Sequence, residues 1–150
     1  MVAPLAALLA ALTVTLGPNG VGKVHFGLTK TKAVAALTQL FGPPTSRGPN
    51  TGCRPRYTEV VWGGLSAEFR VNVFSGYRYR GVKPKLATAT GISLGNTLAQ
   101  VRAAYGKLVF VGTDRWRAPN GLVFYDNAMH DPEPPSSRIV EIKIGTCGDF

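Results

Sequence analysis

Apolar residues recur along this chain with two different periods, and these periods predict its elements. At helical spacing, two groups each fall on a single face: Ala33, Val34, Leu37, Leu40 and Phe41, and later Leu98, Val101 and Tyr105. Elsewhere β-branched and aromatic residues alternate with polar ones, which predicts strands. The expected strands are Thr58 to Trp62, Leu65 to Arg70, Phe74 to Arg80, Leu122 to Tyr125 and Arg138 to Ile144.

The residues at the ends of the two helical stretches are typical of helix boundaries. Thr29 and Thr97 stand where a hydroxyl can accept a hydrogen bond from an unpaired amide of the first turn. Thr97 and Gln100 also have the spacing of a capping box. Gly42 and Gly106 follow the last apolar residues and provide stop signals. We therefore expect helices that begin after the two threonines and end at the two glycines.

An internal repeat becomes visible when Gly27 is placed over Gly95. The segment VHFGLTKTKAVAAL (residues 24–37) then matches ISLGNTLAQVRAAY (residues 92–105), and strand-like segments follow each copy in the same order. The expected fold is α+β, with two tandem helix-plus-antiparallel-sheet repeats, helices on one face and an open sheet face on the other. Repeat one would span about 12–80, a linker about 81–90, and repeat two about 91–150.

Length and composition fit a single domain with an ordinary core, since 45% of the 150 residues are hydrophobic. The net charge of +9 resides in the first half, where residues 1–85 hold eleven Lys or Arg against Glu59 and Glu68. Residues 86–150 hold six of each sign. The basic half provides one functional hypothesis, a polyanion or membrane-surface binder whose affinity falls steeply with salt.

The two cysteines, Cys53 and Cys147, are too far apart for a redox motif or a zinc cluster. A single long-range disulfide is the simplest use, and two buried free thiols are the alternative. A disulfide implies an oxidising compartment, so we expect an extracytoplasmic protein, secreted or in the cell envelope, for which nucleic acid is not the natural ligand. The apolar segment Val2 to Leu16 has no basic region before it, so no signal segment can be bounded.

One segment resembles a catalytic motif. GPNGVGK (residues 17–23) fits the phosphate-loop pattern, but Val24 stands where that motif needs a Ser or Thr for magnesium, and a strand rather than a helix is expected to follow. We interpret GPNG as a turn between strands. His25 and His130 have no partners at ligand spacing, and no hydrolase or metalloprotease signature occurs. A non-enzymatic protein without metal or cofactor is therefore expected; an enzyme with an unrecognised site is the third hypothesis.

The FGLT element, the LGNT element with its later YG, and the final GTCG together resemble a class of secreted actinobacterial proteins of uncharacterised function. Their architecture is similar to that of the β-lactamase inhibitory protein and, more distantly, to small outer-membrane assembly lipoproteins. The first similarity implies a concave, aromatic-rich sheet surface that grips a protein partner. The chain lacks a lipobox cysteine and a disulfide in each repeat, so inhibition of a β-lactamase does not carry over.

The leading hypothesis is a protein-binding or inhibitor-like module that meets a partner of the envelope or medium with its open sheet face. A tight turn at Val71 and Asn72 would place Arg70, Tyr77 and Tyr79 on that face, because side chains alternate along a strand. Arg and Tyr often anchor interfaces. A bulge at Gly76 would reverse the assignment and make both tyrosines core residues.

Overall fold

The computed structural model describes residues 14–49, 57–81, 83–127 and 136–146. These residues form two helices, α1 (Lys30–Phe41) and α2 (Leu98–Tyr105), and twelve strands in two sheets. Neither helix is both long and apolar enough to pass through a bilayer, as far as the described residues extend. Cys53 and Cys147 lie outside the described residues, so the expected disulfide stays a prediction.

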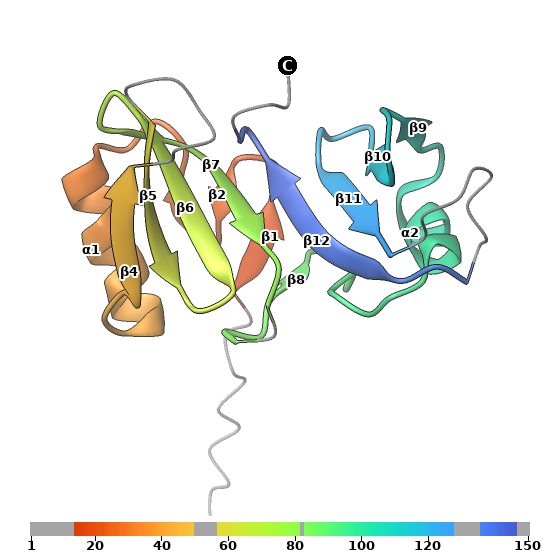
Figure 1. Ribbon diagram of the computed structural model, residues 1–150, viewed down its shortest axis with the longest axis horizontal. Coiled ribbons are helices and arrows are strands. Elements are labelled where there is room, and N and C mark those ends of the chain that lie inside the picture. Colours follow the sequence, from red (N-terminus) through yellow and green to blue (C-terminus); the bar gives the residue numbers. More distant parts are fainter. Residues whose placement is uncertain (1–13, 50–56, 82, 128–135, 147–150) are drawn as a thin grey trace, which may run out of the picture.

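The larger sheet has eight antiparallel strands, and its centre is the pairing of two strands from opposite halves of the chain (Figure 1). In spatial order the strands are β4 (Ser46–Pro49), β5 (Tyr57–Trp62), β6 (Leu65–Arg70), β7 (Val73–Tyr79), β12 (Ile139–Ile144), β11 (Val123–Asp126), β10 (Arg115–Arg117) and β9 (Val109–Phe110). Tyr79 lies opposite Ile142 where β7 meets β12. This pairing makes one continuous sheet of segments far apart in sequence.

The smaller sheet has four short strands in the order β3 (Val24–His25), β2 (Gly20–Val21), β1 (Thr15–Gly17) and β8 (Ala87–Thr88). The first three form a meander with tight turns, and β8 joins β1 in parallel. β8 belongs to the segment that the sequence pattern assigns to a linker. The segment instead returns to the N-terminal strands and completes their sheet.

The expected fold class is therefore wrong. The protein is mostly β, with two sheets and only two short helices, and it does not divide into two helix-plus-sheet repeats. The physical reason is that the edge strands β7 and β12 pair with each other, which satisfies the backbone hydrogen-bonding groups of both edges. The two predicted meanders therefore form one sheet. The positions of the two helices and of most of the long strands are confirmed.

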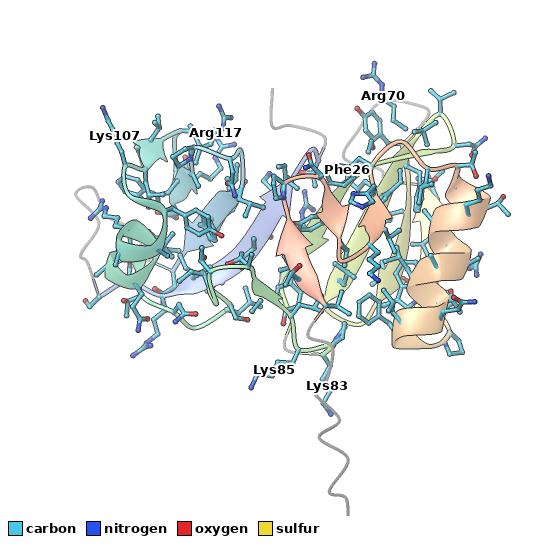
Figure 2. The ribbon with its side chains drawn as sticks, turned by 180° about the vertical axis from the view of Figure 1, so that it is seen from behind. Phe26, Arg70, Lys83, Lys85, Lys107 and Arg117 are labelled. Atoms are coloured by element: carbon cyan, nitrogen blue, oxygen red, sulfur yellow. The ribbon has the colours of Figure 1, made fainter. Side chains whose placement is uncertain are left out.

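Both helices and the smaller sheet lie on the same face of the larger sheet (Figure 1 and Figure 2). A row of apolar side chains crosses that covered face from strand to strand: Trp62, Leu65, Tyr79, Ile142, Phe124 and Trp116. Leu16 of β1 and Leu37 of α1 are buried in the same core. Along the described chain no helix covers the opposite face, which we call the open face.

Both predicted helix caps form, with unequal geometry. The Thr97 hydroxyl accepts from the Gln100 amide at 3.2 Å, and the Gln100 side chain accepts from the Thr97 amide at 2.9 Å. The Thr29 hydroxyl accepts from the Lys32 amide at 3.4 Å, and Lys32 has no side-chain acceptor that could return the bond. The second cap is thus a complete capping box.

We expect Thr97→Ala to lower the free energy of unfolding by about 1 kcal/mol, because it leaves an amide of the first turn without its acceptor. Thr29→Ala should cost less, since its bond is longer and has no reciprocal partner. Urea denaturation of the two variants measures the difference. An equal loss, or a larger one for Thr29→Ala, would show that the capping box contributes nothing extra.

Candidate functional site

The two tyrosines predicted for the open face lie on the covered face instead. Tyr77 is 0% and Tyr79 is 1% exposed. Phe69 pairs with Phe74 as expected, but Glu68 pairs with Gly76, so Ser75 is an extra residue in β7. This β-bulge reverses the side-chain alternation beyond it. The exposed placement of Tyr77 and Tyr79 is therefore wrong.

The hydroxyl groups of these tyrosines connect the two sheets. Tyr77 donates a hydrogen bond to the Gly17 carbonyl of β1 at 2.9 Å. Tyr79 accepts one from the Leu86 amide, just before β8, at 3.0 Å. Burial, with a smaller contribution from Tyr105, raises the pKa of Tyr77 far above its ordinary value, so its phenol stays protonated. Both residues hold the smaller sheet against the larger one.

Arg70, the third predicted binding residue, is exposed at the end of β6 and lies on the open face as expected. Its guanidinium stands 5.9 Å from the centre of the Tyr57 ring, its cross-strand neighbour. Since Tyr77 and Tyr79 point to the other side of the sheet, the structure does not bring the three residues together.

The bulge turns Arg78 and Arg80, rather than the two tyrosines, toward the open face, where side chains of the neighbouring strands adjoin them. Six side chains adjoin one another across β7 with the residue after it, β12, β11 and β10, and we call them the open-face cluster: Arg78, Arg80, Arg115, Tyr125, Glu141 and Lys143. The face of the larger sheet that is turned away from both helices is toward the viewer in Figure 1. Four of the six side chains carry positive charge and one carries negative charge, although Lys143 is buried and two further acids, Glu59 and Glu68, lie on the same face in β5 and β6. The exposed positive charge of Arg80 favours an anionic group of a partner.

Glu141 connects Arg78 of β7 and Arg80, just after that strand, to the middle of the cluster. Its carboxylate lies 3.1 Å from Arg80 Nη2 and 3.3 Å from Arg78 Nε. The Arg78 contact is an ion pair without an aligned hydrogen bond. Arg80 remains 57% exposed in its side chain, whereas Glu141 is only 14% exposed. The network therefore holds one accessible guanidinium in place.

Tyr125 lies between two cations in the other half of the cluster. Lys143 Nζ stands 5.0 Å and the Arg115 guanidinium 6.0 Å from the centre of its ring. Arg115 is fixed by a hydrogen bond from its Nε to the Gly112 carbonyl at 3.1 Å. Cation–π contacts of this kind restrain long side chains that would otherwise be mobile. The aromatic and basic groups are thus arranged before any partner arrives.

A shallow depression of about 200 Å³ adjoins the cluster beside Arg78 and Arg80. Its polar lining includes Ser66, which donates to the Glu59 carboxylate at 2.9 Å. Glu59 is thereby occupied by a neighbour on its own sheet. The depression can receive a side chain from a partner that covers the open face.

The segment with the phosphate-loop pattern forms two tight turns between short strands. Pro18 and Asn19 connect β1 to β2, and β3 follows before α1 begins at Lys30. The interpretation of GPNG as a turn is confirmed. Within the described ranges, no three His, Cys, Asp or Glu side chains gather as a metal site. His25 is exposed, and His130 lies outside the described residues.

The basic residues of the first half do not gather on one face. Arg70 lies at the top of the view in Figure 2, and Lys83 and Lys85 lie at the bottom. Lys32 is exposed on α1, on the covered side of the sheet. A flat anionic surface could therefore not meet all of them at once.

Comparisons with known proteins give a fold and no function. The sequence matches no protein-family profile and no curated protein. Among solved structures it is similar to the uncharacterized protein yfeY from Escherichia coli, with a TM-score of 0.60 and 14% identity. The similarity covers 88% of this chain and 99% of that one. At this identity the likeness shows the fold alone.

Proposed function

We propose that this chain is a non-enzymatic, extracytoplasmic binding module that receives an acidic protein surface on its open face. The observation that carries the proposal is the open-face cluster, in which three arginines, the buried Lys143 and one tyrosine adjoin on a sheet face that no described helix covers. The sequence resemblance implies an inhibitor-like role that also uses a sheet surface. The residues proposed here for that surface differ from those that the sequence predicts.

The chemistry of the cluster suits a protein partner. Arg and Tyr contribute most often to the energy of interfaces because each offers a large, rigid contact surface with hydrogen-bond donors. Arg80 offers an accessible guanidinium, and Tyr125 a ring whose position is fixed by Arg115 and Lys143. Excess positive charge steers an acidic surface toward the face and raises the association rate. The depression beside Arg78 adds a shape that a partner side chain can fill.

The experiment is a quantitative pull-down with the immobilised protein from the envelope and the medium of the cells that produce it. We expect Arg80→Glu to lower the amount of specifically retained partner by about tenfold, because the new carboxylate repels an acidic surface. Lys32→Glu is the matched control. It makes the same change of charge at an exposed residue of α1, which lies on the other side of the sheet. It should retain the partner as the wild type does.

Two results would contradict the proposal. Equal retention by Arg80→Glu and the wild type would show that the open face is not used. Equal loss in Arg80→Glu and Lys32→Glu would show that total charge matters rather than the face, as expected for a polyanion or membrane-surface binder.

A further inference from the structure

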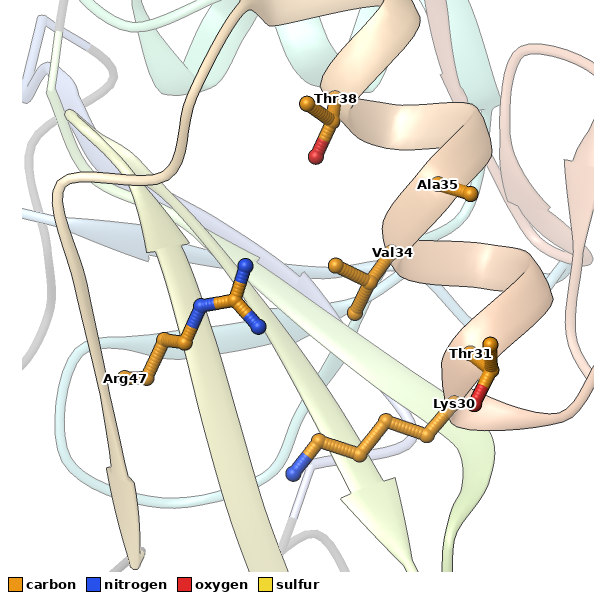
Figure 3. Close-up of a pocket in the computed structure, with 6 residues that line it drawn as sticks. All are labelled: Lys30, Thr31, Val34, Ala35, Thr38 and Arg47. Carbon is orange, nitrogen blue, oxygen red and sulfur yellow. The ribbon is translucent and has the colours of Figure 1, made fainter.

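A groove of about 570 Å³ separates α1 from the edge strand β4, far from the open-face cluster (Figure 3). Its described lining is mostly apolar surface of α1 and aliphatic stems, with two charged groups: Lys30, Thr31, Val34, Ala35, Thr38 and Arg47. Small-molecule sites commonly have this size and this combination of apolar walls with a few polar groups.

The two cations point into the same space from opposite walls. Arg47 extends from β4 toward α1, and Lys30 extends from the start of α1 toward the sheet (Figure 3). Lys30 Nζ donates to Thr58 Oγ1 at 2.9 Å and stands 5.6 Å from the Phe69 ring centre, so its position is fixed and two donors stay free. Arg47 has no hydrogen bond or ion pair with any residue that the structure describes.

None of the described residues that line the groove is acidic. The closest strand with an acid is β5, where Glu59 points to the open face and accepts from Ser66. Two cations that converge without a counter-charge repel each other, and an anion between them removes this repulsion. The groove is therefore complementary in charge to an anion and in polarity to an apolar body.

We infer that the groove between α1 and β4 binds a small organic carboxylate, with the carboxylate between Arg47 and Lys30 and its aliphatic body along Val34. A guanidinium meets a carboxylate with two parallel hydrogen bonds, which suits the free donors of Arg47. The Thr38 side chain points toward the same space and borders the aliphatic body (Figure 3). This site is independent of the open-face binding proposed above.

The test is a titration of the full-length protein with octanoate, followed by calorimetry and by amide chemical shifts. We expect saturable binding, with the largest shifts at Val34, Thr38 and Arg47. Octanol, which lacks the charge, and acetate, which lacks the apolar body, should each bind at least about tenfold more weakly. Arg47→Gln should weaken octanoate by about tenfold, because it removes a charge-assisted pair of hydrogen bonds.

Lys32→Gln provides the control, since Lys32 is exposed on the same helix but does not line the groove. It should leave the affinity for octanoate unchanged. Three results would each overturn the inference: no octanoate binding at millimolar concentration, equal binding of octanol, or equal binding by Arg47→Gln and the wild type. Amide shifts confined to the open face would overturn it as well. Arg47 is exposed, so its variant should fold normally.

Discussion

Replacing Tyr77 or Tyr79 by alanine should lower the free energy of unfolding by about 3 to 5 kcal/mol, the cost of removing a large aromatic side chain from a core. Both rings are fully buried. Each hydroxyl also makes a hydrogen bond to the segment that carries the smaller sheet, at Gly17 or Leu86. Urea denaturation followed by circular dichroism measures the loss.

Two control variants separate the contributions. Tyr77→Phe keeps the ring and leaves the Gly17 carbonyl without its donor, so it should cost about 1 to 3 kcal/mol. Arg70→Ala removes an exposed side chain with one cation–π contact and should cost less than about 1 kcal/mol. A loss below 1 kcal/mol for Tyr77→Ala would mean that the ring is not core. The bulge at Ser75 would then be placed wrongly, and with it the open-face cluster.

Gly76→Ala should be the second most damaging substitution, with a loss of about 3 kcal/mol. A Cβ atom at Gly76 would lie 2.7 Å from the Ile144 carbonyl oxygen and would overlap the Gly145 carbonyl oxygen. Ile144 ends β12 and Gly145 follows it, and β12 pairs with β7 at the centre of the larger sheet. The strands would have to separate to accept the methyl group.

Gly48→Ala is the matched control, because a Cβ atom there meets no atom within 4 Å. It lies in edge strand β4 and should change stability by less than about 0.5 kcal/mol. Thermal denaturation of both variants provides the comparison. If Gly76→Ala were as stable as Gly48→Ala, the close approach of β7 and β12 would be contradicted.

The features that the sequence predicts correctly depend on local signals. The capping threonines and the helical period locate α1 and α2, and the two-residue turn at Val71 and Asn72 fixes the pairing of Arg70 with Val73. Both turn residues have positive φ, 49° and 60°, as a tight hairpin with the twist of its strands requires. Signals of this kind involve residues close in sequence.

The features that the sequence does not predict depend on long-range pairing or on a single inserted residue. β8, β9 and β10 are two or three residues long, too short for alternation to be visible. The union of β7 with β12 requires strands from opposite halves of the chain to meet. Ser75 follows the regular pattern in sequence, yet its bulge exchanges the faces of all later residues of β7.

The same bulge explains why only part of the candidate site was predictable. Arg70 precedes it and keeps its expected place, whereas Tyr77 and Tyr79 follow it and move to the core. Arg78 and Arg80 take their place on the open face. Tyr125 of β11 lies near these arginines because β12 pairs with β7 on one side and with β11 on the other.

Site-specific photo-crosslinking tests most directly whether the open face is the binding surface. Benzoylphenylalanine would replace Tyr125 on the open face in one variant and Gln39, exposed on α1, in another. Both variants would be irradiated in the cells that produce the protein. We predict a discrete protein adduct from position 125 that Arg80→Glu suppresses, and no such adduct from position 39. An adduct from position 39 alone, or adducts of equal yield from both positions, would contradict the open face as the binding surface.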